Sequence, residues 1–474
     1  MSVVDRIREC AADAGERPAL RLCRGGGAEG VSYAELVRRA DAVAGELRRA
    51  GLRPGDRCGL QAPQGPAFVE LALGILAAEG CLVPIPDDHR GALFDAFAER
   101  ARLHHAVGPA GPALRSFERV PAVDGQGDRR FRSLRPAYLR FTSGTTSRRK
   151  GVVLGHAAVS ARLDAANRAL EIGPADRVLW LLPMAHHFVV SILLYLSRGA
   201  TLLLPASPLA RPILDFAARE GATVLYASPH HHDLLSRDEG GPALDRVRLA
   251  VSTADALRRP VAERFRRRFD TPLVQALGII EVGLPVANLK AAATKPEALG
   301  RPLPDYEVWL RGEDGRRLSG PTSPERCGEI AIRGPGMLDA YLDPWLPAEE
   351  VLEDGAFRTG DQGWIDAEGE LFLEGRRANR ISMAGMKFFA EEVEAVLDRH
   401  PGVVESRVRP REHAHLGEVP VAELVALRPE APPTRSDLVR HCREHLPPYK
   451  VPRDFTWVPE LPHTSSGKLR RGAP

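Results

Sequence analysis

Lysine is scarce in this sequence, because only six of its 65 basic residues are lysines and the others are arginines. The lysines are Lys150, Lys290, Lys295, Lys387, Lys450 and Lys468. The net charge is also small, +3 over 474 residues, and the basic residues are scattered along the chain. This balance argues against nucleic acid as the main partner. Any lysine that falls within a recognisable motif therefore deserves weight.

Signs of secretion, of membrane insertion and of a metal cluster are missing as well. The six cysteines show no CxxC spacing, which is typical of reduced structural cysteine. The N-terminal residues include charges and no apolar segment of the kind found in signal peptides. The longest apolar run, 188–196, is too short to cross a bilayer and is interpreted as buried core. The consecutive histidines 230–232 point in different directions, so we interpret them as loop residues and not as a metal site. We expect a soluble cytoplasmic protein.

The hydrophobic content of 44% and the length predict two or three packed units with a substantial core. Leu36, Ala40, Val43 and Leu47 predict an amphipathic helix within 32–50. Helical patterns precede short apolar strands repeatedly: a helix from about 68 precedes 81–85, 211–220 precedes 223–226, and 261–269 precedes 272–274. This alternation predicts an α/β fold whose parallel sheet is covered on both faces.

The pattern changes after about residue 300. Short alternating segments at 307–310, 328–332 and 370–373 are separated by Gly, Pro and Asp, which predicts a β-rich subdomain. A compact α+β region follows, with a helix at 391–399 and a strand at 421–427.

The segment from Tyr138 to His156 is rich in groups that bind phosphate. Thr142, Ser143, Gly144, Thr145 and Thr146 place hydroxyls around a glycine, and Lys150 follows. Such a loop offers hydroxyl and backbone N–H donors and one cation to phosphate oxygens. It is not a Walker A loop, because no Ser or Thr follows the lysine, and this disfavours a P-loop kinase or NTPase. An ordinary polar surface turn is the alternative for the loop taken alone.

Further motifs follow in a fixed order. They are Leu182 to His186, Gly278-Ile279-Ile280-Glu281, Gly328 to Tyr341, Phe357 to Asp361, Gly375-Arg376 with Gly385, and Pro462 to Lys468. With the phosphate loop, this series resembles the adenylate-forming family, which includes acyl-CoA synthetases, luciferases and peptide-synthetase adenylation domains. The resemblance covers the chain from Tyr33 to Lys468 and is closest to stand-alone aryl-acid or acyl-acid ligases.

The resemblance implies an α/β N-terminal domain over 1–376, whose β-rich subdomain spans about 300–376, and a small mobile α+β domain over 377–474. It also implies an ATP- and Mg²⁺-dependent ligase that converts a small carboxylic acid to an acyl-adenylate. The acyl group then passes to the thiol of CoA or to the phosphopantetheine of a separate acyl carrier protein.

Residue roles follow from the same resemblance. Thr142–Thr146, Lys150, Gly278 and Lys468 contact ATP, as do Asp361 at the ribose and Arg376. Glu281 and Thr146 hold Mg²⁺, and Lys468, Glu281 and His186 are the catalytic residues. The acid lies against His186, His187, Thr253, Gly278 and Gly283.

Several positions depart from the family pattern. Leu277 replaces an aromatic residue, Ile280 replaces a threonine at the α-phosphate, and Ala378 replaces a polar residue at the hinge. Ser147, Arg149, Ser382 and Thr253-Ala254 also depart from the family pattern. Losing one phosphate contact costs about 1–3 kcal/mol, which weakens adenylation without abolishing it. An adenylate-binding or thiol-transfer-only descendant is therefore the alternative function.

The segment Pro183 to His187 is more similar to the aryl-acid branch than to long-chain fatty acid ligases. It has no aspartate where peptide-synthetase domains bind an amine. We therefore expect an aromatic acid first and a medium-chain fatty acid second. For His187, packing in the core is an alternative to contact with a substrate hydroxyl.

Overall fold

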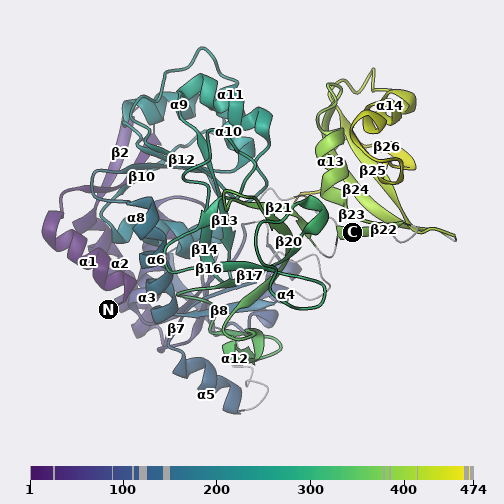
Figure 1. The fold of residues 1–474 in the computed structure, drawn as a ribbon. Coiled ribbons are helices and arrows are strands. Elements are labelled where there is room, and N and C mark those ends of the chain that lie inside the picture. Colours follow the sequence, from purple (N-terminus) through teal and green to yellow (C-terminus); the bar gives the residue numbers. More distant parts are fainter. Residues whose placement is uncertain are drawn as a thin grey trace. The chain divides into compact units, whose positions relative to one another are not determined.

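The computed structural model describes residues 2–24, 27–87, 89–108, 111–116, 125–141, 150–376, 379–383, 386–413, 415–463 and 469 (Figure 1). These residues form two compact units. Among the described residues, the first unit comprises those up to 307 together with 333–357. The second comprises 308–332 and those from 358 onward. The predicted boundary between 376 and 377 stays a prediction.

The first unit contains a large sheet whose central strands are parallel and whose edges are antiparallel. Its strand order is β15-β14-β13-β12-β11-β9-β10-β1-β2. The strands are β1 (Pro18–Arg24), β2 (Gly27–Ser32), β9 (Arg177–Trp180), β10 (Thr201–Leu204), β11 (Val224–Ala227), β12 (Leu249–Ser252), β13 (Leu273–Ile279), β14 (Gly283–Ala287) and β15 (Arg301–Pro302). The parallel pairing from β1 through β10, β9, β11 and β12 to β13 brings the carboxyl ends of these strands to one edge.

A second mixed sheet completes the strands of the first unit. Its order is β19-β18-β8-β7-β4-β3-β5-β6. The strands are β3 (Arg57–Leu60), β4 (Cys81–Pro84), β5 (His105–Gly108), β6 (Gly111–Ser116), β7 (Pro136–Phe141), β8 (Gly151–Gly155), β18 (Ala340–Tyr341) and β19 (Leu346–Pro347). Antiparallel pairing of β7 with β8, and of β8 with β18, brings Tyr341 opposite Val152.

Helices cover these sheets, as the alternating pattern predicts. They are α1 (Val3–Ala14), α2 (Tyr33–Arg49), α3 (Pro66–Ala77), α4 (Ala92–Arg100), α5 (Gly125–Ser133), α6 (His156–Leu170), α7 (Met184–His187), α8 (Leu193–Ser197), α9 (Ala210–Arg219), α10 (Pro229–Ser236), α11 (Arg259–Phe269) and α12 (Ala348–Val351). A π-helical turn over Phe188–Ile192 joins α7 to α8. Apolar residues of α9, α10 and α11 form one core with β9 to β13, and α6 contacts strands of both sheets (Figure 1).

The second unit contains two smaller sheets. One has the order β16-β17-β20-β21, and the other has β23-β22-β25-β24 with β26 paired to β25. The strands are β16 (Glu307–Arg311), β17 (Gly328–Arg333), β20 (Phe357–Ile365), β21 (Leu371–Arg376), β22 (Arg380–Met383), β23 (Met386–Phe389), β24 (Val403–His413), β25 (Gly417–Ala426) and β26 (Asp454–Trp457). Helices α13 (Ala390–Leu397) and α14 (Arg435–His445) pack on the second sheet, and 3₁₀ turns cover Pro324–Arg326 and Pro448–Lys450.

The predicted α/β class is confirmed, and the predicted helix within 32–50 forms as α2, where the Ser32 side chain accepts a hydrogen bond from the Glu35 N–H. The apolar run at 188–196 is buried where its side chains are described. The interpretation of His230–His232 as loop residues is wrong, because they lie in α10. Pro229 occupies the first helical position, where its missing N–H leaves no hydrogen bond unmade. No helix among the described residues has the length and apolarity to cross a membrane.

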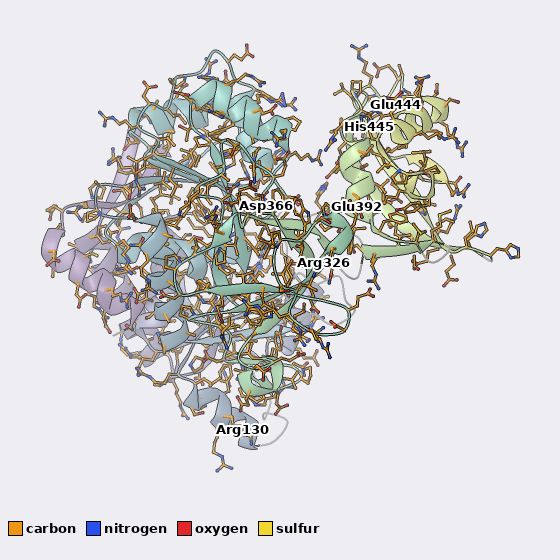
Figure 2. All side chains as sticks on the ribbon, viewed as in Figure 1. Arg130, Arg326, Asp366, Glu392, Glu444 and His445 are labelled. Atoms are coloured by element: carbon orange, nitrogen blue, oxygen red, sulfur yellow. The ribbon has the colours of Figure 1, made fainter. Side chains whose placement is uncertain are left out.

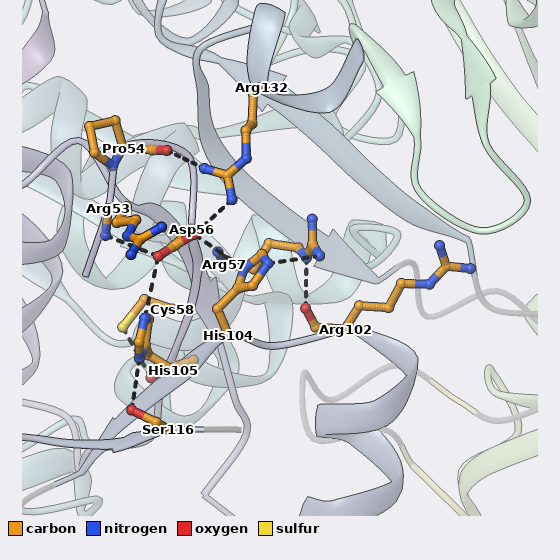
Figure 3. Close-up of polar contacts among 11 residues, drawn as sticks. Arg53, Pro54, Asp56, Arg57, Cys58, Arg102, His104, His105, Ser116 and Arg132 are labelled. Atoms are coloured by element: carbon orange, nitrogen blue, oxygen red, sulfur yellow. Dashed lines mark hydrogen bonds and ion pairs between the residues drawn. The ribbon is translucent and has the colours of Figure 1, made fainter. Parts of the chain in front are cut away.

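A buried carboxylate, Asp56, fixes the start of β3 to its neighbours (Figure 3). Its side chain is inaccessible to solvent and accepts hydrogen bonds from Arg132 at 2.8 Å and from the Arg53 N–H at 2.9 Å. The Nε2 of His105 lies 3.3 Å from the carboxylate, and the Nδ1 lies 3.2 Å from Ser116 Oγ. His105 and Ser116 face each other across β5 and β6, so this Ser–His–Asp chain is accounted for by cross-strand pairing.

The environment of Asp56 determines its charge. Burial alone raises the pKa of Asp56, but the hydrogen bonds from His105, Arg132 and Arg53 outweigh burial and hold the pKa well below its usual value. The carboxylate therefore stabilises the fold at neutral pH. Because the folded-state pKa is lowered, this contribution is present above the unfolded-state pKa and is lost as the pH falls.

We predict that Asp56→Ala destabilises the protein by about 3 kcal/mol at pH 7, because it leaves Arg132 and His105 without their buried anion. Thermal unfolding, followed by circular dichroism, measures the effect as a drop in midpoint. The exposed Asp95, which pairs with Arg115, is the matched control and should lose little on substitution by Ala. The difference in thermal midpoint between wild type and Asp56→Ala should begin to narrow below about pH 4, near the unfolded-state pKa of an aspartate. Equal midpoints for the two variants at pH 7 would contradict this role.

Candidate active site

Glu281, Tyr341 and Lys150 lie together in the first unit. Tyr341 donates a hydrogen bond of 3.0 Å from its hydroxyl to Oε1 of Glu281, and both side chains are buried. The Nζ of Lys150 lies 4.6 Å from the centre of the Tyr341 ring, a cation–π distance. The structure thus brings two predicted site residues, Glu281 and Lys150, to one tyrosine. Burial raises the pKa of Glu281, while the Tyr341 hydrogen bond and two nearby arginines act in the opposite direction.

Arg162 of α6 fixes the turn that carries Glu281. Its guanidinium is fully buried and donates to the carbonyl oxygen of Ile280 at 3.0 Å and to that of Gly336 at 2.9 Å. Gly336 has a φ of +68°, and a Cβ there would lie 2.5 Å from the carbonyl oxygen of Ala158 and 2.6 Å from the backbone nitrogen of Arg162, so only glycine fits. Burial lowers the pKa of Arg162 to about 10. At neutral pH the side chain stays charged and joins two loops that lie far apart in the sequence.

Arg140 is a second cation beside these residues. It lies on β7, just before the phosphate loop, and donates to the carbonyl oxygen of His186. Its Nη2 lies 3.5 Å from the Nδ1 of His186. The Nε of Arg140 is buried, and no described residue accepts a hydrogen bond from it. A buried donor of this kind suits an anionic ligand. Arg140 lies within the segment from Tyr138 to His156, but the prediction for that segment named only its hydroxyls, Gly144 and Lys150. Arg162 lies outside every predicted motif.

Aromatic residues surround His187. The ring of Trp180 stacks on Tyr226 with centroids 5.1 Å apart, and the His187 ring lies 6.1 Å and 6.2 Å from these two. Tyr195 contacts the same pair edge-on. We call these four side chains the aromatic cluster. Trp180, Tyr195 and Tyr226 are buried, whereas His187 is half-buried.

The cluster lies at the carboxyl ends of parallel strands. Tyr226 and Trp180 are paired neighbours on β11 and β9, and Thr253 directly follows β12. The Thr253 hydroxyl donates to the Ala276 carbonyl at 3.1 Å. Burial raises the pKa of Tyr226, and a hydrogen bond with Thr253 acts in the opposite direction. In parallel α/β sheets, this edge is where ligands bind.

The two glycines predicted to line the substrate site differ in their surroundings. Gly278 is exposed, and a Cβ there would meet only Thr253, at 3.8 Å. Gly283 is buried with a φ of +112°, and a Cβ there would lie 3.2 Å from the Tyr306 hydroxyl and 3.3 Å from Arg162. The structure therefore places Gly278 beside Thr253, and it places Gly283 against Arg162.

The second unit carries Asp361 and Arg376 as a directly opposed pair on β20 and β21. The Nε of Arg376 lies 3.0 Å from Oδ1 of Asp361, which is buried. The Thr359 hydroxyl accepts a hydrogen bond from the Asp361 N–H and donates to the Ile330 carbonyl. Arg376 therefore contacts the carboxylate from the neighbouring strand, and the Thr359 side chain fixes the backbone at Asp361.

Several predicted residues lie outside the described part of the chain. They are Thr142, Ser143, Gly144, Thr145, Thr146, Ser147 and Arg149 of the phosphate loop, Ala378 and Gly385 at the hinge, and Lys468.

We predict that Arg162→Met lowers the thermal midpoint and raises the KM for ATP. Each buried carbonyl that loses its donor costs about 1–3 kcal/mol, and the turn that holds Glu281 loosens. Arg168→Met is the control. Arg168 lies on the same helix, and both Arg168 and its ion-pair partner Asp305 are exposed. Calorimetry and steady-state kinetics measure the two effects, and identical behaviour of the two variants would contradict the role given to Arg162.

Comparison with known proteins places these residues in a family. A sequence model described as AMP-binding enzyme matches residues 7–342, and one described as AMP-binding enzyme C-terminal domain matches residues 392–468. The chain is 32% identical over 341 residues to a sulfoacetate–CoA ligase of Cupriavidus necator, an alignment that covers 71% of this chain and 66%, just under two thirds, of that protein. It is 29% identical over 471 residues to a feruloyl-CoA synthase of an Amycolatopsis species, covering 94% of both proteins.

The fold has close structural relatives. The crystal structure of ATP-bound MatB from Rhodopseudomonas palustris superposes with a TM-score of 0.84 at 24% identity, covering 99% of this chain and 97% of that one. This likeness confirms the predicted fold. The two sequence models together match most of the chain and confirm the predicted family resemblance. The chain belongs to the AMP-binding enzyme family.

Proposed function

We propose that the chain is an AMP-forming ligase that joins a carboxylic acid to the thiol of CoA in two steps. In the first, the carboxylate attacks the α-phosphorus of ATP, so that an acyl-adenylate forms and pyrophosphate leaves. In the second, a thiol attacks the acyl carbon and AMP leaves. The grouping of Lys150, Tyr341 and Glu281 supports this proposal. Lys150, which follows the phosphate loop in the sequence, contacts the ring of the tyrosine that donates a hydrogen bond to the buried Glu281 carboxyl group.

Charge is the main obstacle in the first step, since a carboxylate must approach a polyphosphate. Lys150 and Arg140 supply positive charge to the site, and the buried Nε of Arg140 offers a donor to an anion. Among the residues that the structure describes, the Lys150 ammonium group contacts the face of the Tyr341 ring and no carboxylate, so it can turn toward a phosphate without breaking an ion pair with them. These features support anion binding by this unit.

The residues present also fit a magnesium ion. Glu281 offers a carboxylate, the hard oxygen ligand that Mg²⁺ prefers, and Tyr341 orients it through Oε1. With Thr146, Glu281 would hold the ion, which when bound neutralises phosphate charge. Tyr341 then acts as a positioning residue for the carboxylate.

The second unit contributes the remaining predicted contacts. Asp361 would accept the two ribose hydroxyls of ATP, and Arg376 restrains that carboxylate from the neighbouring strand. By the family resemblance, residues 377–474 form the mobile domain that presents Lys468 to the carboxylate and the α-phosphate in the first step. The domain then turns to admit the thiol.

We predict that Lys468→Ala abolishes adenylation but spares transfer from a supplied acyl-adenylate to CoA. Because this lysine neutralises charge only in the first step, its removal should lower the rate of that step alone, by about 10²–10³-fold. Acid-dependent exchange of labelled pyrophosphate into ATP measures the first step, and thioester formation from synthetic acyl-adenylate measures the second. Lys295→Ala is the control. Equal losses in both steps would contradict the role of Lys468, and absence of exchange with every acid in wild type would contradict the ligase proposal.

For the acid, we propose an aromatic carboxylate, with a medium-chain fatty acid as second choice. The aromatic cluster supports this choice, because a planar acid would gain stacking and edge contacts beyond its buried area. The absence of a side chain at Gly278 leaves space beside Thr253, where the strands end. The similarity to feruloyl-CoA synthases supports the same class, and the names of these relatives favour CoA over an acyl carrier protein as the acceptor.

We predict that His187→Leu lowers kcat/KM for aromatic acids that carry a ring hydroxyl and leaves it unchanged for those that do not. If His187 hydrogen-bonds a ring hydroxyl, its loss costs about 0.5–1.5 kcal/mol, so kcat/KM falls about two- to tenfold for hydroxybenzoates and stays constant for benzoate. Pyrophosphate exchange with both acids measures this ratio. A matched control is Phe372→Ala, which removes a stacked aromatic pair with Trp364 in the second unit.

The competing role of His187 gives a different result. If His187 only packs in the core, its substitution would lower the thermal midpoint and would change kcat/KM for the two acids by the same factor. An unchanged ratio between hydroxybenzoate and benzoate would therefore contradict substrate contact.

An adenylate-binding or thiol-transfer-only descendant is the second candidate, and Ile280 is the observation in its favour. The Ile280 carbonyl is committed to Arg162, and its side chain provides no hydroxyl for the α-phosphate. Such a descendant would transfer acyl groups from supplied adenylate and would show no pyrophosphate exchange in the wild-type chain.

A further inference from the structure

Helix α14 carries a histidine–glutamate–histidine group that the proposed ligase reaction does not use. Figure 2 labels Glu444 and His445 on this helix of the second unit. His441, Glu444 and His445 each offer one ligand atom, and these atoms lie within 4.8 Å of one another. His441 and His445 are four residues apart, so both project from one face of the helix. Among the described residues, no other group of three potential ligands meets this distance.

Backbone carbonyls determine which ring nitrogens are available. The Nε2 of His441 lies 2.9 Å from the Val396 carbonyl oxygen of α13, and the Nδ1 of His445 lies 2.9 Å from the His441 carbonyl oxygen. Because a carbonyl only accepts, each of these nitrogens carries the proton. The neutral rings therefore keep lone pairs on Nδ1 of His441 and Nε2 of His445. Ring orientation by a carbonyl is the usual arrangement behind metal-bound histidines.

The position on the helix favours a cation. The three residues occupy the last turn of α14, where the carbonyl groups at the C-terminus give a negative potential. Glu444 adds a carboxylate, and both Glu444 and His445 are exposed, so an ion can reach them. Arg440 and Arg443 lie on the same helix, and Arg440 pairs with Asp437. His400 packs edge-on against His441, and its Nδ1 accepts the Gly402 N–H, so the proton of its neutral ring is on Nε2.

We propose that His441, Glu444 and His445 bind a divalent transition-metal ion such as Zn²⁺, Ni²⁺ or Cu²⁺. Two imidazoles and one carboxylate suit these ions, whereas Mg²⁺ prefers oxygen ligands only. The site is thus separate in chemistry from the magnesium of the proposed adenylation step. Three protein ligands leave a coordination position open to solvent or to an external ligand.

Isothermal titration of the full chain with ZnCl₂ and with NiCl₂ tests this site. We expect one ion per chain in wild type. His445→Ala removes an exposed ligand without disturbing packing and should raise the Kd at least tenfold, and His441→Ala/His445→Ala should abolish the specific binding. The matched control is His413→Ala/His415→Ala, which removes two neighbouring histidines whose ring centroids lie 6.3 Å apart. This control should keep the wild-type Kd.

The outcomes separate this site from the active site. Pyrophosphate exchange with Mg²⁺ should be equal in wild type and His445→Ala, because His445 takes no part in the proposed reaction. A wild-type chain that binds no stoichiometric Zn²⁺ or Ni²⁺ would overturn the proposal. An unchanged Kd in His445→Ala would overturn it as well. So would a loss of metal binding in His413→Ala/His415→Ala as large as that in His441→Ala/His445→Ala.

Discussion

The buried charge of Arg162 is the constraint on which the first unit's site depends. An arginine that is almost inaccessible to solvent has lost its hydration, so its N–H groups must be satisfied by protein acceptors. Ile280 and Gly336 supply those acceptors as backbone carbonyls. Turning these carbonyls toward one guanidinium fixes the two loops that carry Glu281 and lead to Tyr341. Because the planar guanidinium has several donors in a fixed geometry, a lysine could not hold both loops in the same way.

Arginine and lysine have different tasks in this chain. The arginines near the site are held in place: Arg162 joins loops, and Arg140 is bonded to the His186 carbonyl. Lys150 contacts the Tyr341 ring through a cation–π interaction and remains able to turn. A compact ammonium on a flexible stem can follow charge as it moves during phosphoryl chemistry, whereas a fixed guanidinium provides a constant field. A sequence with so few lysines keeps one directly after its phosphate loop.

The aromatic cluster is a direct product of strand pairing in the large sheet. Trp180 and Tyr226 stack because β9 and β11 are adjacent parallel strands in register, so the same pairing that builds the sheet builds one wall of the candidate acid site. His187 enters from α7, which leads into a π-helical turn. Such turns alter the side-chain spacing of a helix and are frequent at functional sites. The departures at Leu277 and Ile280 lie on or next to β13, the next part of the same sheet edge.

The sequence by itself determined the family, the α/β alternation and the motif residues, because helix and strand periodicity and short motifs are recorded within a few neighbouring residues. Even so, one local signal was misread, since Pro229 begins a helix that contains His230–His232. Arg162 and Arg140 were not recognised, nor was the metal-ligand group on α14. Arg162 acts on residues 118 and 174 positions away, and the ligand group depends on a carbonyl of α13 that orients His441. Only the tertiary structure decided these contacts, because the satisfaction of a buried charge or of a ring nitrogen depends on groups that folding brings near.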